Sequence, residues 1–220
     1  MPSVPSNKIN FSNLSFGEVK TTKWGRKIPI YYASNGECCP FEVELERCAS
    51  FGVQRNKFGN MILKLAPSHI DVKILENIRV SVIGHLKNTK IPDFVFDGKL
   101  KSPVYGEFSK RLDPQLNEDK ESKRVYTRFY DKENKWKLPL KDVKEKKFDA
   151  QAVLTFMSVW LKKDGSASLT IRAKKVFVWW NELDSEDEYI DKPDSPIRKR
   201  KRKKRSKSSD DDSLESSEEE

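Results

Sequence analysis

The sequence predicts a mainly β domain, either a small barrel or a β-sandwich, followed by a disordered C-terminal tail. Apolar and polar residues alternate in most segments between residues 13 and 180, with many β-branched and aromatic side chains. A long hairpin is indicated near the end of this region, where two such segments flank Asp164-Gly165. The composition changes abruptly after residue 180, where charged residues replace the apolar ones. We therefore expect a domain over 13–180 and a tail over 181–220.

The expected strands follow the alternation along the chain. They cover residues 27–32, 41–48, 60–65, 78–86, 104–108, 124–130, 150–162 and 168–180. Residues 66–76 are compatible with a short helix or another strand, and 112–123 have no apolar period and predict an exposed loop. The first twelve residues, rich in Pro, Ser and Asn, predict a flexible arm.

The net charge of +9 conceals a division between domain and tail. Residues 1–180 hold 33 basic and 20 acidic residues, a charge of +13, whereas the tail holds 10 basic and 14 acidic residues. A strongly basic domain is typical of proteins that bind polyanions such as nucleic acids.

The tail consists of three charged blocks, which are too polar to offset the entropy of ordering. Residues 182–194 and 208–220 carry seven acids each, and the block between them is basic. The basic run predicts a nuclear-import signal or a contact to phosphates; it comprises Arg198, Lys199, Arg200, Lys201, Arg202, Lys203, Lys204 and Arg205. Serines followed by acids three residues later predict phosphorylation, and these are Ser185, Ser208, Ser209, Ser216 and Ser217. The acidic end is either a solubility tail or an internal mimic of nucleic acid that competes for the basic domain.

Bases and aromatic rings are interleaved within the expected strands. In 124–130, one face carries Arg124, Tyr126, Arg128 and Tyr130, a combination suited to stacking bases and neutralising phosphates. Further candidates of the same kind are Trp136, Lys137, Arg172, Lys174, Lys110 and Arg111. In 168–180, one face carries Leu169, Ile171, Ala173, Phe177 and Trp179. The other face carries Thr170, Arg172, Lys174, Val176 and Trp180.

Catalysis and cofactors are not expected. The chain has no Gly-rich phosphate loop, GxSxG or HExxH motif, although scattered carboxylates leave a small nuclease or phosphatase as a remote alternative. The three cysteines lack zinc-site spacing and indicate a reducing compartment, so neither a metal nor a disulfide is expected. No apolar run approaches the roughly 20 residues of a membrane span, so we expect no membrane partner.

The layout resembles the OB-fold single-stranded DNA-binding proteins of phages and nucleocytoplasmic large DNA viruses. The segments that prompt the comparison are 102–111, 124–130, 167–180 and the acidic end at 208–220. The resemblance implies an OB-like barrel that binds single-stranded DNA without strong sequence preference, in viral replication, recombination or repair. It also implies an acidic tail that occupies the DNA groove and recruits replication proteins. The long basic run departs from this pattern and adds an import receptor as a partner, which implies a host nucleus or viral replication site.

The alternative function is a non-enzymatic nuclear or virion interaction protein built on a β-sandwich. RNA in place of DNA and a homodimer both remain open at this point.

Overall fold

The computed structural model describes residues 3–180 except 24, 35 and 120. The predicted tail lies outside the described residues, together with its basic run and its candidate phosphorylation sites. The strands in chain order are β1 (Val4–Pro5), β2 (Leu14–Phe16), β3 (Lys20–Thr22), β4 (Gly25–Ser34), β5 (Glu37–Glu44), β6 (Cys48–Arg55), β7 (Met61–Ala66), β8 (Val104–Tyr105), β9 (Arg111–Leu112), β10 (Gln115–Leu116), β11 (Arg128–Asp131), β12 (Lys137–Leu138), β13 (Phe148–Leu161) and β14 (Ala167–Trp179). The helices are the 3₁₀ turns η1 (Ser6–Lys8) and η2 (Phe11–Asn13) and the α-helices α1 (His69–Asn88) and α2 (Leu140–Val143).

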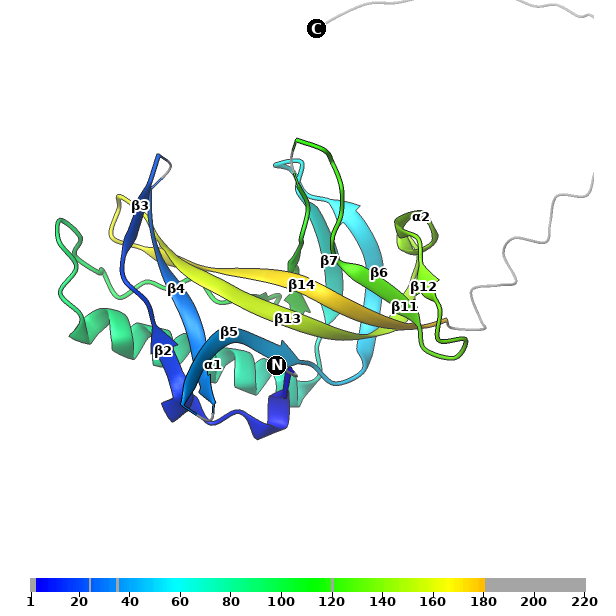
Figure 1. Ribbon diagram of the computed structural model, residues 1–220, viewed down its shortest axis with the longest axis horizontal. Helices are drawn as coiled ribbons and strands as arrows, with labels where there is room; N and C mark the ends of the chain where they lie inside the picture. Colours follow the sequence, from blue (N-terminus) through cyan, green and yellow to red (C-terminus); the bar gives the residue numbers. More distant parts are fainter. Residues whose placement is uncertain (1–2, 24, 35, 120, 181–220) are drawn as a thin grey trace, which may run out of the picture. The chain divides into compact units, whose positions relative to one another are not determined.

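The hairpin of β13 and β14 runs across the domain and organises the sheet (Figure 1). The predicted turn at Asp164-Gly165 is confirmed: Gly165 has φ 83°, and its N–H donates to the carbonyl of Lys162 at 3.2 Å. Such a positive φ suits glycine, which has no Cβ to clash. The two strands of 14 and 13 residues offer long edges, on which several shorter strands pair in succession.

Five strands close into a barrel. β13 pairs with β6, β6 with β7 and β7 with β10, all antiparallel, and β10 pairs in parallel with β14. Numbered in chain order, these strands follow one another around the barrel as 1-2-3-5-4. This arrangement confirms the mainly β prediction and is compatible with an OB-like barrel with extra strands, not with a sandwich of two sheets. The extra strands include β4 and β5, which pair with the remaining length of β13.

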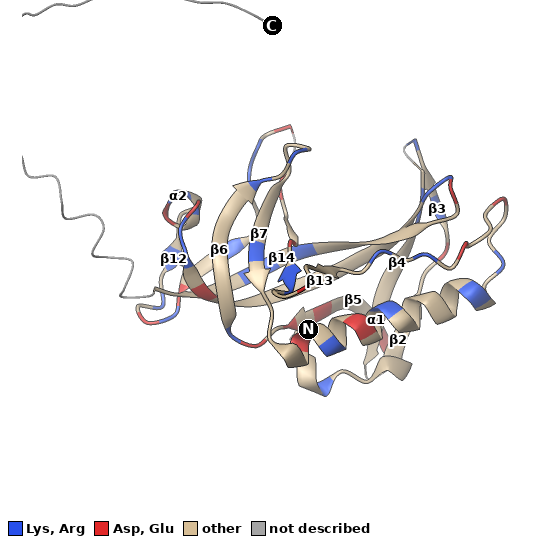
Figure 2. Ribbon diagram, turned by 180° about the vertical axis from the view of Figure 1, so that it is seen from behind, with Lys and Arg blue, Asp and Glu red and all other residues tan. Residues whose placement is uncertain are grey.

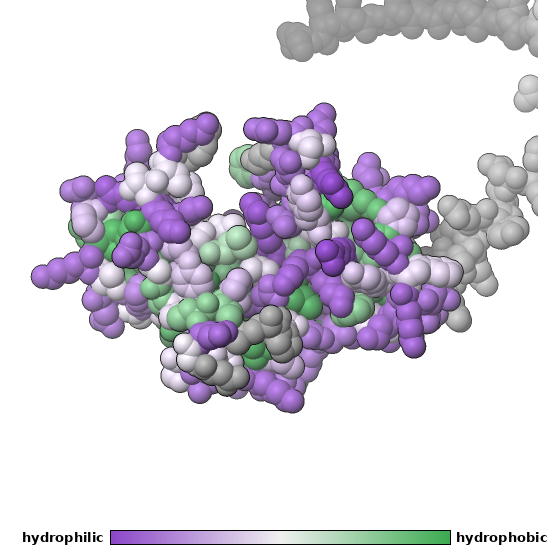
Figure 3. Space-filling view, in the orientation of Figure 1, coloured by the Kyte–Doolittle hydropathy of each residue, from purple (hydrophilic) through white to green (hydrophobic). Residues whose placement is uncertain are grey.

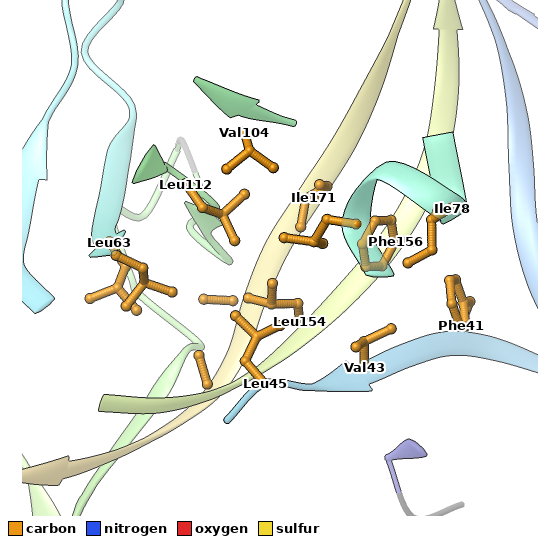
Figure 4. Packing of buried hydrophobic residues seen from close by; sticks show 14 of the residues in the cluster. Phe41, Val43, Leu45, Leu63, Ile78, Val104, Leu112, Leu154, Phe156 and Ile171 are labelled. Atoms are coloured by element: carbon orange, nitrogen blue, oxygen red, sulfur yellow. The ribbon is translucent and has the colours of Figure 1, made fainter. Parts of the chain in front are cut away.

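The core of the domain, which includes the barrel and the extra strands, is filled by aliphatic and aromatic side chains (Figure 4). Phe156 of β13 and Phe41 of β5 are fully buried, with ring centroids 5.1 Å apart. Leu63 and Leu154 lie in the same cluster and are likewise inaccessible to solvent. This continuous core holds the outer faces of the strands in fixed register.

Residues 78–86 are helical, so the strand expected there was wrong. They belong to α1, which begins after the N-cap Ser68, whose hydroxyl accepts a hydrogen bond from the Asp71 N–H at 3.1 Å. The buried side chains follow helical spacing along this segment: Asp71, Leu75, Ile78, Val82 and Leu86. The segment contains both a period of two and a helical period, so its sequence fits either element, and burial of the helical stripe in the core selects the helix.

Residues 112–123 are only partly the exposed loop that we expected. Leu112 of β9 and Leu116 of β10 are buried, and β10 is the strand that closes the barrel against β14. Strands of two residues are too short to produce a visible period, so the sequence conceals them.

Residues 3–12 lie against the domain instead of extending from it as an arm. Val4 and Pro5 form β1, which pairs in parallel with β5, and Ser6 is buried. Ile9 and Phe11 pack against the core as well. Apolar anchors spaced along a polar segment account for this docking.

Candidate nucleic-acid interface

The segment 124–131 presents the alternation that its sequence predicts. Arg124, Tyr126 and Arg128 are exposed, whereas Thr127 and Phe129 are buried. The Thr127 hydroxyl donates to the carbonyl of Ala173 at 2.6 Å, and β11 pairs in parallel with β14 just beyond this contact. This pairing places the exposed face of the segment beside the outer face of β14.

A groove of about 490 Å³ lies where these two faces meet. Six of the ten predicted binding residues line it, namely Arg124, Tyr126, Arg128, Tyr130, Lys137 and Lys174. Lys175 and Asn117 also contribute, and no described residue of the lining is acidic. We call this feature, with its five Lys and Arg side chains, the cationic groove.

An irregularity in β14 changes which residues face the groove. Leu154 of β13 pairs with Ala173, but the preceding Val153 pairs with Lys175, so Lys174 is an extra residue. A bulge of this kind exchanges the two faces of the strand beyond it. Val176 and Val178 are accordingly buried, whereas Phe177 and Trp179 are half-buried on the other face.

The predicted faces of β14 were therefore wrong beyond Lys174. Phe177 and Trp179 do not share the face of buried Ile171, and Val176 does not share a face with Arg172. Trp180 packs against the core, with its ring 5.8 Å from that of Phe148. The pair Lys174-Lys175, two adjacent bases within an alternating strand, is the signal in the sequence that marks the bulge.

Cations lie over the aromatic rings beyond the bulge. The Lys175 ammonium is 4.3 Å from the ring centroid of Phe177 and 5.1 Å from that of Tyr130. Lys132 lies 4.6 Å from Phe177, and the Arg47 guanidinium lies 4.9 Å from Trp179. These contacts extend the interleaved pattern past the cationic groove, and sequence reasoning assigned a binding role to none of Arg47, Lys175, Phe177 and Trp179.

The charges of the cationic groove are mostly not neutralised by the protein. Lys174 pairs with Glu42 of β5 at 2.6 Å. By contrast, Arg124, Arg128, Lys137 and Lys175 have no ion pair with any described residue. The charged residues of β14 are all basic and those of β5 are all acidic, as the colours of Figure 2 show.

Arg172 lies at one end of the groove without lining it. Its guanidinium donates to the side-chain oxygen of Asn117 at 3.0 Å, while its Nε is buried and has no partner in the described structure. Trp136 is exposed on the turn between β11 and β12 and does not line the groove either.

Lys110 and Arg111 are placed elsewhere, at the hairpin of β8 and β9. Lys110 donates to the carbonyl of Gly106 at 2.9 Å, and the Arg111 guanidinium lies 3.9 Å from the ring centroid of Phe51. The structure thus does not join these two predicted residues to the cationic groove.

Two turns of the barrel also present basic side chains. The β6–β7 turn carries Lys57 beside the exposed ring of Phe58, and the β13–β14 turn carries Lys162 and Lys163. In OB-folds the corresponding loops border the ligand. The surface is hollowed between the projecting end of β3 and the loops that follow β6 and β10 (Figure 3).

Among the described residues there is no cluster of three His, Cys, Asp or Glu side chains that would hold a metal ion. Nor does any helix in the described part of the chain have the length and apolarity to cross a bilayer. No protein-family model matches the chain, and no curated protein matches its sequence.

Proposed function

We propose that this protein binds single-stranded nucleic acid, with DNA favoured, through the cationic groove and without strong sequence preference. One observation supports this proposal most directly: basic side chains and tyrosine rings line the same groove. They are Arg124, Arg128, Lys137, Tyr126 and Tyr130. Four of these residues belong to the single segment 124–130, and the β11–β12 pairing brings Lys137 beside them. The parallel pairing of β11 with β14 adds Lys174 and Lys175 to the same groove.

The rings favour a single strand over a duplex. The bases of a duplex are stacked on one another, whereas the bases of a single strand are free to stack on an exposed aromatic side chain. Tyr126 is 49% exposed and lies 5.5 Å from the guanidinium of Arg124, so ring and cation are both available to one nucleotide.

The unpaired cations supply affinity that does not depend on sequence. Each phosphate that a Lys or Arg neutralises releases condensed counterions. For a single strand, the logarithm of the affinity then falls by about 0.7 per neutralised phosphate for each tenfold rise in salt concentration. Four cations of the groove lack acidic partners within the described structure, so few carboxylates of the protein compete with phosphates for them.

We place the protein in viral DNA replication, recombination or repair, in the nucleus or at a viral replication site. The acidic end of the tail would recruit replication proteins, and the basic run at 198–205 would bind an import receptor. The charge pattern of the sequence supports these assignments.

The full-length Tyr126→Ala variant tests the proposal. We expect its affinity for an oligo-dT 20-mer to fall by about 1–3 kcal/mol, because one stacking platform is lost, with a smaller loss for a duplex of equal length. Fluorescence anisotropy at matched salt measures both affinities. Phe108→Ala is the matched control, since that ring is 98% exposed and lines no part of the groove.

Equal losses for the oligonucleotide and the duplex would contradict stacking. Failure of the wild-type protein to prefer the single strand at any salt concentration would overturn the proposed function as a whole.

A further inference from the structure

A second cavity, of about 340 Å³, opens along the edge of β14 before the bulge. The residues of its wall that carry the argument are Lys101, Tyr105, Asp113, Trp160, Leu169 and Thr170. We call it the edge cavity. It shares no lining residue with the cationic groove.

The backbone of β14 is open at this cavity. Ala167 uses both its N–H and its C=O on the outer edge of β14, bonding to Lys99 and Lys101 at 2.9 and 3.1 Å. Successive residues of a strand direct these groups to alternate edges, so those of Leu169 point to the same edge as those of Ala167. No described strand pairs with the edge at Leu169, because the next partner is Gln115 opposite Arg172. One N–H and one C=O are therefore available side by side.

Two aromatic rings flank this open edge. Trp160 of β13 is half-buried, and its ring lies against the backbone of Gly25, where an added Cβ would come within 3.0 Å of Cζ2. Tyr105 is partly exposed, and its hydroxyl donates to Asp113 at 2.8 Å. Burial, with the bond to Asp113, raises the pKa of Tyr105 to about 12, so the hydroxyl stays neutral at physiological pH.

The edge cavity lies close to the cationic groove on β14. Thr170 lines the cavity, Lys174 lines the groove, and Arg172 lies between them. Four strand residues span roughly 13 Å. One bound strand is long enough to contact both sites, with the Arg172 guanidinium and the Lys101 ammonium near its phosphates.

We propose that the edge cavity is a nucleobase pocket, in which one base of the strand bound in the cationic groove stacks on Trp160 and hydrogen-bonds to the backbone of Leu169. The proposal rests on the proposed function. A flat base with adjacent donor and acceptor groups matches an open N–H and C=O beside an aromatic ring. A peptide strand fits less well, because Lys101 and Gln115 already occupy the edge of β14 on both sides of the gap.

Photocrosslinking of the full-length wild-type protein tests this pocket. The probe is an oligo-dT 20-mer carrying 5-iododeoxyuridine at single positions, and mass spectrometry identifies the crosslinked residues. We expect crosslinks at Trp160 or Tyr105 in addition to Tyr126 or Tyr130 of the groove. A Trp160→Leu variant should also lose roughly fivefold or more in affinity, the loss of one stacked base, while Phe108→Leu should lose nothing.

The outcomes separate the two proposals. Crosslinks confined to the groove, with unchanged affinity of the Trp160→Leu variant, would overturn the nucleobase pocket and leave the groove intact; a peptide as the true occupant would give this result. Absence of both crosslinks and binding would overturn the proposed function itself. Because crosslinking uses the wild-type chain, a folding defect of Trp160→Leu does not decide the matter.

Discussion

The α1 side of the barrel and the cationic groove use similar charged residues in opposite ways. On the α1 side, Arg79 donates to Glu76 at 3.2 Å and to the carbonyl of Leu100 at 2.7 Å, and Ser102 donates to Glu76. Asp71 is buried there and accepts from the N–H of Glu46 at 3.1 Å. In the groove, Arg124 and Lys175 lie over tyrosine rings without any acidic partner among the described residues.

This difference separates charges that are paired within the described structure from charges that are not. A charge whose hydrogen bonds are satisfied within the protein stabilises the fold or offsets its own desolvation. A group of exposed cations that repel one another contributes nothing to stability and is available to an anionic partner. Variants on the α1 side should therefore change stability, and variants in the groove should change binding.

The largest effect is expected on the α1 side, from Ile78→Ala. Ile78 is fully buried between α1 and the barrel, so its truncation should lower the free energy of unfolding by about 2–5 kcal/mol. Urea denaturation measures this change. Val80→Ala, at a helix position that is 61% exposed, is the control and should change stability by about 0.5 kcal/mol or less. Similar losses of stability in both variants would contradict the packing of α1 against the core. A change in the oligo-dT affinity of folded Ile78→Ala would contradict the separation of stability on the α1 side from binding in the groove.

The next effect concerns the double variant Arg128→Glu/Lys137→Glu in the groove. Both side chains are exposed and line the groove, so we expect a loss of roughly 10- to 100-fold in oligo-dT affinity and a smaller salt dependence. Binding titrations at several salt concentrations measure both quantities. The matched control is Lys73→Glu/Lys87→Glu, which makes the same charge change at exposed positions of α1. Equal loss in both double variants would show that net charge, and not the groove, carries the binding.

The smallest effect is a pH dependence at Asp71. Burial raises the pKa of this carboxyl, an effect that hydrogen bonds from Ser6, Ser68 and the Glu46 N–H partly oppose and the charge of Glu46 strengthens. The native state thus holds the proton more tightly than the unfolded chain, so this contribution to stability is present at acidic pH and is lost as the pH rises through the native pKa. Asp71→Asn should remove that loss, so its stability relative to wild type should increase from acidic to neutral pH in urea denaturation. A difference independent of pH would show that Asp71 titrates normally.

Local patterns were sufficient to predict which side chains of 124–130 are exposed. Arg124, Tyr126 and Arg128 share an exposed face because a strand alternates its side chains, whatever it packs against. Asp164-Gly165 likewise specifies its turn through glycine's tolerance of positive φ. Trp136, Lys110 and Arg111 are of the same aromatic and basic types, but they lie outside the groove. The local sequence does not specify which strands become neighbours, so it could not predict this.

The sequence by itself determined the β class, the hairpin and the basic, aromatic face of 124–130, because these depend on neighbours along the chain. Only the tertiary structure decided that residues 78–86 are helical, that Lys174 is a bulge and that β10 closes the barrel. Each of these depends on burial against strands distant in sequence, whose energy exceeds the local preference. The bulge is the clearest case. One extra residue, accommodated by pairing with β13, places Phe177 and Trp179 on the face opposite buried Ile171, where both are half-buried.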